Sequence, residues 1–141
     1  MTVTLSDEAR RLLALYEQET DATVRDCVVD DDHDRILFLV AAGDMPEAIG
    51  PGGKHVRALE ERLDREIKLV EDADNAADFV ANALAPAAVF NVTMSRNDDL
   101  VAYVEVAQED RGAAIGSGGR NIDAARLLAD RHYDVDAIEL T

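Results

Sequence analysis

The stretch Ile49-Gly50-Pro51-Gly52-Gly53-Lys54-His55-Val56 recurs with conservative changes as Ile115-Gly116-Ser117-Gly118-Gly119-Arg120-Asn121-Ile122. The two copies are separated by 66 positions (116 − 50). In each copy an isoleucine precedes the glycines, and a cation and a branched apolar residue follow them. Further pairs match at the same offset: Asp44 and Asp110, Ala48 and Ala114, Ala58 and Ala124, Asp64 and Asp130, Arg65 and Arg131. One structural unit therefore occurs twice in the chain.

The sequence around the first copy predicts an ordered series of helices and strands. Ser6 is suited to cap a helix whose apolar stripe is Ala9, Leu12, Leu13 and Tyr16. Residues 23–30 and 35–41 are rich in branched apolar residues and predict a hairpin, and we expect the acidic tract at 30–34 to be its solvated tip. A short helix at 45–49, the glycine loop, a helix carrying Val56, Leu59 and Leu63, and a strand at 66–70 complete the unit.

The second half predicts the same order. A helix at 75–84 ends before Pro86, because a residue that precedes proline disfavours helical geometry. Strands follow at 89–96 and 99–106, then a short helix near 109–114, the second glycine loop, a helix from 120 to about 132 and a strand at 135–139. The expected fold class is α+β, with two domains at residues 1–71 and 72–141. The junction is short, so we expect the domains to pack together.

The glycine loops are the candidate functional site. A tight turn of glycines before a helix places backbone amides beside the positive end of the helix dipole, which favours an anion such as phosphate. Lys54 and Arg120 stand at matching positions in the first turn of the following helices. A simpler interpretation is that both turns merely connect helices. The recurrence of the whole pattern favours a binding role. The loops match neither a Walker phosphate loop, which needs glycine at position 48 and Ser or Thr at 55, nor a dinucleotide fingerprint.

The chain is strongly acidic, with 30 Asp and Glu against 14 Lys and Arg and a net charge of −16. Such a charge repels nucleic acid at long range. The carboxylates are spread along the whole chain, which is typical of a surface adapted to very high salt. At high salt the Debye length is short and long-range repulsion is screened. We therefore interpret the acidity as a halophilic surface.

Other function classes have little support in the sequence. Cys27 is the only cysteine, so an intrachain disulfide and a thiolate zinc site are excluded, and its apolar neighbours indicate burial. The histidines lie in separate elements without a nucleophile pattern, and the acidic tract at 30–34 lacks the glycine and glutamate of a calcium loop. We predict no catalytic residue, metal or cofactor, and hence no enzyme. The sequence shows neither a signal peptide nor an apolar run that could span a bilayer, which predicts a cytoplasmic protein with no membrane partner.

Ile-Gly-x-x-Gly followed by a cation and an apolar residue, placed between two helices, resembles the GXXG motif of the KH domain, in its helix-first type II form. The resemblance covers nearly the whole chain. Two such domains in tandem, with Gly-Pro-Gly-Gly-Lys in the first, resemble the archaeal NusA-like factors of transcription termination and antitermination. This resemblance implies an RNA-binding protein, and the acidic composition adds a halophilic source.

The resemblance implies that each GXXG loop clamps the backbone of single-stranded RNA while bases lie on an apolar groove. The residues this assigns to RNA binding are Gly50, Pro51, Gly52, Gly53, Lys54 and Arg57 in the first domain and Gly116, Ser117, Gly118, Gly119 and Arg120 in the second. We expect Ile49, Val56, Ile115 and Ile122 to be core residues at the loop roots. The third strands, near 67–69 and 135–138, are expected to form the far wall of the groove. The six aromatic residues have core-like spacing, so we expect no stacking contribution to binding.

Two other hypotheses remain open at this stage. In the first, the chain binds RNA in ribosomal RNA maturation. In the second, it is a KH-fold interaction module that docks on a protein partner. RNA polymerase and other parts of the transcription or translation machinery are the candidate protein partners.

Overall fold

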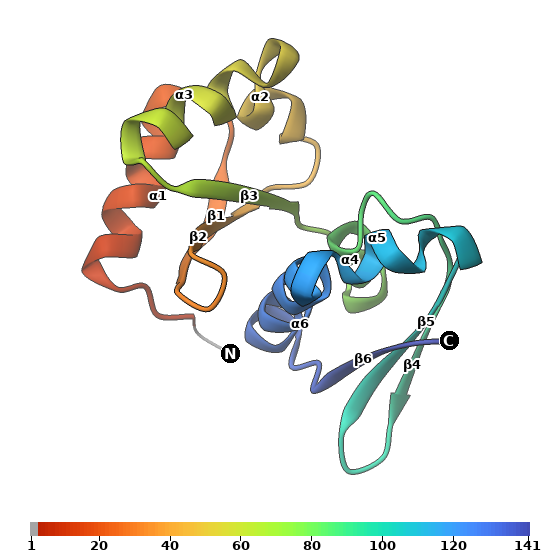
Figure 1. Ribbon diagram of the computed structural model, residues 1–141. Helices are drawn as coiled ribbons and strands as arrows, with labels where there is room; N and C mark the ends of the chain where they lie inside the picture. The colour runs from red at the N-terminus through yellow and green to blue at the C-terminus, as the bar shows by residue number, and fades with distance from the viewer. Residues whose placement is uncertain (1–2) are drawn as a thin grey trace. The chain divides into compact units, whose positions relative to one another are not determined.

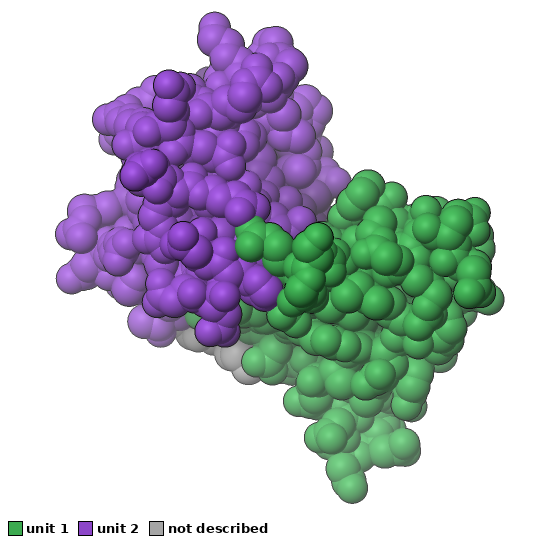
Figure 2. All heavy atoms as spheres, viewed as in Figure 1, with its two compact units in different colours: residues 1–3, 73–141 green, residues 4–72 purple. Residues whose placement is uncertain are grey.

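The computed structural model describes residues 3–141, which form two compact units. One unit comprises Thr4–Asp72, and the other comprises Ala73–Thr141 together with Val3 (Figure 2). Each unit combines one three-stranded sheet with helices (Figure 1). The predicted α+β class and the repeated order of elements are confirmed.

The elements of the first unit follow the predicted order, with bounds that differ by no more than a residue or so. They are α1 (Asp7–Glu19), β1 (Val24–Asp30), β2 (Arg35–Val40), α2 (Met45–Ile49), the 3₁₀ turn η1 (Pro51–Gly53), α3 (Lys54–Leu63) and β3 (Glu66–Glu71). The Ser6 side chain caps α1 as expected, since its Oγ accepts the amide of Ala9 at 3.1 Å.

The second unit repeats this order with one additional 3₁₀ turn. Its elements are α4 (Ala76–Ala83), β4 (Val89–Arg96), β5 (Leu100–Val106), η2 (Gln108–Asp110), α5 (Arg111–Ile115), η3 (Ser117–Gly119), α6 (Arg120–Tyr133) and β6 (Ala137–Leu140). The short helix expected near 109–114 is thus divided into η2 and α5.

The sheets have the same mixed topology. In the first, β2 is central, antiparallel to β1 and parallel to β3, and in the second β5 takes the same place between β4 and β6. Parallel strands must be joined by a crossover, because a hairpin can join only antiparallel neighbours. In each unit the short helix, the glycine loop and the next helix form this crossover. The topology therefore places each glycine loop between two helices.

The core of the first unit lies between its helices and one face of its sheet. Tyr16 from α1, Phe38 from β2 and Leu59 from α3 meet there, each at most 3% exposed. The rings of Tyr16 and Phe38 lie 4.7 Å apart, centre to centre. Cys27 belongs to the same cluster and is 2% exposed, so the prediction of a buried thiol is confirmed.

The hairpin between β1 and β2 differs from expectation at its base. Asp31, Asp32 and Asp34 are exposed as predicted, but Asp30 is only 8% exposed and Arg35 only 2%. The two residues pair across the hairpin, with Arg35 Nε 2.9 Å from Asp30 Oδ2. Alternation along a strand does not reveal this pairing, because both residues are charged and would each be assigned to solvent.

The repeat does not keep a constant offset beyond the glycine loops. Asp64 follows the end of α3 and Asp134 follows the end of α6, and each adopts a left-handed conformation, with φ of 52° and 55°. Asp130, which matches Asp64 in the sequence, therefore lies inside α6. Helix α6 has 14 residues and α3 has 10, so α6 is about one helical turn longer than α3.

The last strand begins two residues later than expected. The left-handed turn at Asp134 redirects the chain, and Asp136 then bonds to Leu100, with its amide donating to the Leu100 carbonyl at 2.8 Å. Its carboxylate in turn accepts the Leu100 amide at 2.7 Å. Strand β6 therefore begins at Ala137, while Val135 is buried in the preceding turn.

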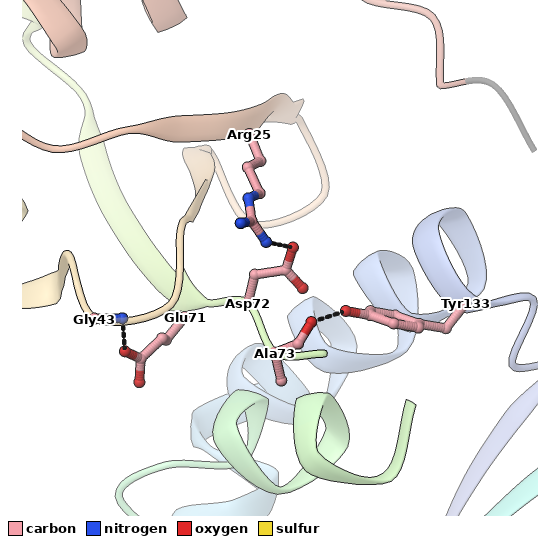
Figure 3. Close-up of polar contacts among 6 residues, drawn as sticks. All are labelled: Arg25, Gly43, Glu71, Asp72, Ala73 and Tyr133. Atoms are coloured by element: carbon pink, nitrogen blue, oxygen red, sulfur yellow. Dashed lines mark hydrogen bonds and ion pairs between the residues drawn. The ribbon is translucent and has the colours of Figure 1, made fainter. Parts of the chain in front are cut away.

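Every residue of the junction from Glu71 to Ala73 is bound to its own unit (Figure 3). Glu71 Oε2 accepts the amide of Gly43, and Asp72 Oδ2 lies beside Arg25 Nη1, both at 2.9 Å. The Ala73 carbonyl accepts the Tyr133 hydroxyl at 2.7 Å. The chain thus passes between the units at the Asp72–Ala73 peptide without a free linker.

Candidate nucleic-acid interface

The two glycine loops have nearly the same backbone conformation. Gly50, Gly52 and Gly53 have φ of 79°, 61° and 82°. The matching values at Gly116, Gly118 and Gly119 are 77°, 62° and 83°. Positive φ is readily available only to glycine, so the spacing of the glycines determines the shape of the loop. The sequence repeat is therefore also a repeat in backbone geometry.

The first glycine of each loop is needed for a second reason. A Cβ on Gly50 would lie 2.9 Å from the backbone nitrogen of His55, and one on Gly116 would lie 2.7 Å from that of Asn121. The chain thus turns so tightly that the start of the next helix occupies the place of a side chain. At Gly52 and Gly118 no atom lies within 4 Å of such a Cβ, so space is open above the third residue of each loop.

The tips of both loops are accessible. Pro51, Gly52, Ser117 and Gly118 are all exposed. Each loop closes on itself, since Gly53 donates to the Gly50 carbonyl at 3.0 Å and Gly119 to the Gly116 carbonyl at 3.1 Å. Among residues 3–141 we find no hydrogen bond to the Gly52 or Gly118 amide. These amides are available to an anion at the N-terminus of the following helix.

Cations accompany both loops at the predicted positions. Lys54 is exposed and forms no ion pair among the residues that the structure describes, and Arg120 is half-buried. Arg57 is exposed, and its Nη1 donates to the Gly52 carbonyl. This contact brings the guanidinium onto the loop itself. The structure therefore places all eleven predicted site residues in two local clusters, one around each loop.

The isoleucines before the loops are not core residues, contrary to expectation. Ile49 is 36% exposed and Ile115 is 39% exposed, whereas Val56 is half-buried and Ile122 is 4% exposed. Each isoleucine is the last residue of a short helix, and its backbone bends away immediately at the following glycine. The side chain therefore remains at the surface beside the loop, where it offers an apolar contact.

Polar anchors hold the short helix under each loop, and the sequence pattern did not identify them. The Tyr16 hydroxyl donates to the Ala48 carbonyl at 2.8 Å. At the equivalent carbonyl in the second unit, Ala114 accepts Asn121 Nδ2 at 3.1 Å. His55, which matches Asn121, instead has Nδ1 2.8 Å from the Glu47 carbonyl. One feature of the sequence could have identified these anchors: each loop is followed, two positions later, by a polar residue, His55 or Asn121.

Replacing Tyr16 with phenylalanine is expected to change how stability depends on pH. Burial, and secondarily the charge of Glu60, raises the pKa of Tyr16 above its ordinary value of about 10. Above pH 10 the unfolded tyrosine ionises while the folded one remains neutral, so the wild type loses about 1.4 kcal/mol per pH unit from this group. The variant loses about 1–2 kcal/mol at neutral pH, because the Ala48 carbonyl lacks its donor.

Urea unfolding in molar KCl from pH 8 to 11.5 measures this effect. The stability difference between wild type and Tyr16→Phe should shrink above pH 10. A difference that stays constant across this range would show that Tyr16 titrates alike in both states. Tyr103→Phe is the matched control, since Tyr103 is 42% exposed.

The aromatic residues are not all in the core. Tyr16, Phe38 and Phe79 are fully buried, but Phe90 is 67% exposed and Tyr103 is 42% exposed. Phe90 lies at a bulge in β4, where the register with β5 shifts. A bulge disturbs the alternation of strand faces, which explains the wrong expectation for Phe90. Tyr103 lies on the face of β5 opposite to the buried Ala102 and Val104.

The third strands contribute mainly to the cores. Ile67 is 7% exposed and packs in the first core with Leu69, and Ile138 is fully buried. A groove wall formed by these strands remains a prediction.

Among residues 3–141, no helix has both the length and the apolar composition needed to cross a membrane.

Comparison with known families matches each half of the chain to a KH-domain model. Residues 13–74 match the KH domain, and residues 76–141 match the NusA-like second KH domain. Each match includes one glycine loop with its flanking helices.

Curated relatives cover the whole chain. A protein of Halobacterium salinarum named "Probable transcription termination protein NusA" is 60% identical over 141 residues, which is all of both chains. A protein of the same name from Halococcus morrhuae is 57% identical over 99% of both. These relatives come from halophilic archaea, in agreement with the interpretation of the acidic composition.

A solved structure shares the fold along nearly the whole chain. The crystal structure of APE1850 matches with a TM-score of 0.86 and 28% identity, and the match covers 97% of this chain and 100% of that one. Fold, family models and full-length relatives agree. The chain belongs to the archaeal NusA family and consists of two tandem KH domains, as its repeated glycine loops predicted.

Proposed function

We propose that this protein binds single-stranded RNA through both GXXG loops and acts in transcription termination or antitermination in the cytoplasm. The observation that carries the proposal is the pair of exposed loops with matching backbone, each at the N-terminus of a helix and each beside a cation. The names of the full-length relatives support the role in transcription. We propose residues 1–71 and 72–141 as the two binding domains.

The chemistry of the loops suits a sugar-phosphate backbone. An RNA phosphate at Gly52 or Gly118 would meet an open amide, the positive end of α3 or α6, and no Cβ. Lys54, Arg57 and Arg120 would add charge-assisted contacts. Ile49 and Ile115 lie beside the loops and offer apolar surface to bases. This combination is the one that KH domains use on unpaired RNA.

The net charge of −16 is compatible with this function only when salt is high. At about 1 M salt the Debye length falls to roughly 3 Å, so distant carboxylates no longer repel the RNA. If the protein neutralises two RNA phosphates, a tenfold rise in salt lowers the affinity by about 1.4 decades. The slope of log affinity against log salt is about −0.7 per phosphate for single strands. Binding therefore persists in concentrated salt, and no catalytic step is needed for this role.

The proposal is tested by binding of a fluorescent single-stranded RNA in molar KCl. The variant carries Pro51→Asp, Gly52→Asp, Ser117→Asp and Gly118→Asp, all at exposed loop positions. We expect its affinity to fall at least about 100-fold, since both clamps then carry carboxylates where phosphates would bind. Equal binding by wild type and variant would refute the clamp.

A charge-matched control separates this local effect from added negative charge. It carries Ala14→Asp, Gln18→Asp, Asn97→Asp and Gln108→Asp, which are exposed positions outside the loops. Its RNA affinity should stay within about threefold of wild type at a salt concentration that screens distant charges.

One observation favours a second candidate function, that of a protein-docking module. Phe90 and Tyr103 expose aromatic surface on the second sheet, and exposed aromatic residues are enriched in protein interfaces. Retention of RNA polymerase by the four-Asp loop variant, together with unchanged RNA binding, would support docking. Cross-linking to ribosomal precursors in place of other transcripts would instead assign the RNA binding to ribosomal RNA maturation.

A further inference from the structure

The two loops share their backbone but differ in charge. Arg57 in α3 and Asp123 in α6 occupy the same position relative to their loops, three residues beyond Lys54 and Arg120. The first turn of α3 therefore carries two cations, whereas that of α6 carries one cation and one carboxylate. The difference amounts to two charges at one equivalent position.

Both side chains lie against the last glycine of their loop. Arg57 Nη1 is 2.9 Å from the place where a Cβ on Gly53 would be, and it donates to the Gly52 carbonyl. Asp123 Oδ2 is 3.2 Å from the corresponding place on Gly119. An RNA phosphate on the first loop would thus meet a guanidinium, and one on the second loop would meet a carboxylate.

The neighbouring charged groups do not remove this difference. Glu60, the next acid along α3, is occupied by the Ile67 amide at 2.9 Å. Arg126 stands one turn beyond Asp123 at 3.9 Å, and its Nη2 donates to the Ile138 carbonyl at 3.0 Å. Arg126 lies near Oδ1 of Asp123, whereas Oδ2 is the oxygen nearest Gly119, and both side chains are about half-exposed.

One backbone feature acts in the opposite direction. Pro51 has no amide hydrogen, whereas the matching Ser117 has one, so the second loop offers one more donor. A single neutral amide contributes less to phosphate binding than a reversal from carboxylate to guanidinium, since charge-assisted hydrogen bonds are about twice as strong as neutral ones and the carboxylate also repels. The charge difference therefore dominates.

We propose that the first loop, Gly50–Gly53 with Lys54 and Arg57, is the principal phosphate clamp, and that Asp123 makes the second loop an auxiliary contact. This inference rests on the proposed function. It gives the two KH domains unequal roles on one RNA strand: the first domain supplies most of the affinity, and Asp123 limits that of the second.

The matched variants Gly52→Asp and Gly118→Asp test the inference in molar KCl. Both positions have φ near 60° and no atom within 4 Å of an added Cβ, so the two substitutions disturb the fold alike. Aspartate tolerates this conformation better than most residues. We expect Gly52→Asp to weaken RNA binding about tenfold or more and Gly118→Asp less than about threefold.

Charge reversal provides the complementary test. Asp123→Arg should tighten binding and steepen the slope of log affinity against log salt by about 0.7, the value for one more phosphate contact on a single strand. Arg57→Asp should weaken binding and flatten the slope by about the same amount. If a loop variant fails to fold, two other variants provide the comparison. The double variant Lys54→Gln with Arg57→Gln then replaces Gly52→Asp, and Arg120→Gln replaces Gly118→Asp.

The outcomes are distinguishable. Equal losses from the two loop variants, or a larger loss from Gly118→Asp, would overturn the unequal roles while leaving the RNA clamp intact. No loss from either would refute the proposed function itself, and the inference with it. An unchanged salt slope in Asp123→Arg would show that no phosphate lies near that position.

Discussion

Replacing Gly116 with alanine is expected to lower the free energy of unfolding by about 3 kcal/mol. Gly116 has φ of 77° and ψ of 165°, a region almost exclusive to glycine. The added Cβ would also lie 2.7 Å from the backbone nitrogen of Asn121, which no side-chain rotation can relieve. The loop would have to open at its root, and its alignment with α6 would be lost.

Gly118→Ala is the matched control for this prediction. Gly118 has φ of 62° and ψ of 20°, and no atom lies within 4 Å of its added Cβ, so the cost is about 1 kcal/mol. Urea unfolding in molar KCl, followed by circular dichroism, measures both variants. Similar losses at the two positions would show that conformational preference alone, without the close approach of Asn121, accounts for the need for glycine.

Replacing Asp30 with alanine is expected to cost about 3–5 kcal/mol, because it removes a carboxylate from a buried guanidinium. Arg35 is 2% exposed, and its Nε lies 2.9 Å from Asp30 Oδ2. Water cannot replace the lost partner at that depth, so the desolvation cost of the charge is no longer offset. This pair closes the hairpin that begins β2, the central strand of the first sheet.

Two comparisons make this second prediction specific. Glu19→Ala removes the partner of Arg62 in an ion pair whose side chains are 47% and 59% exposed, and it should cost less than about 1 kcal/mol. The double variant Asp30→Val with Arg35→Met should recover most of the loss, since an apolar pair needs no charge compensation. An Asp30→Ala loss no larger than that of Glu19→Ala would show that Arg35 is sufficiently stabilised by its other contacts.

These predictions connect stability with the candidate site. Gly116 shapes the loop directly, whereas Asp30 and Arg35 stabilise the sheet that supports the crossover. Gly116→Ala should therefore lower RNA affinity and stability together. Asp30→Ala should lower stability and leave the RNA affinity of the folded fraction unchanged.

The sequence by itself determined the repeated architecture and the candidate loops. Helical and strand periodicity, the cap at Ser6 and the glycine spacing act over a few residues, so they can be read directly from the chain. The glycines at 50, 52 and 53, and their counterparts, predicted tight turns, and the structure contains these turns with positive φ at each glycine. Resemblance to known KH domains then added the implied role of these loops.

Tertiary structure decided which polar and apolar groups are buried. The pairing of Asp30 with Arg35 and the bond from the Tyr16 hydroxyl to the Ala48 carbonyl depend on what another element presents. The exposure of Ile49 follows from a backbone bend, and that of Phe90 from a bulge in the strand pairing. Only the folded crossover shows that Arg57 and Asp123 lie against their loops. Periodicity reports which face a residue takes along its own element, whereas burial and charge pairing depend on contacts between different elements.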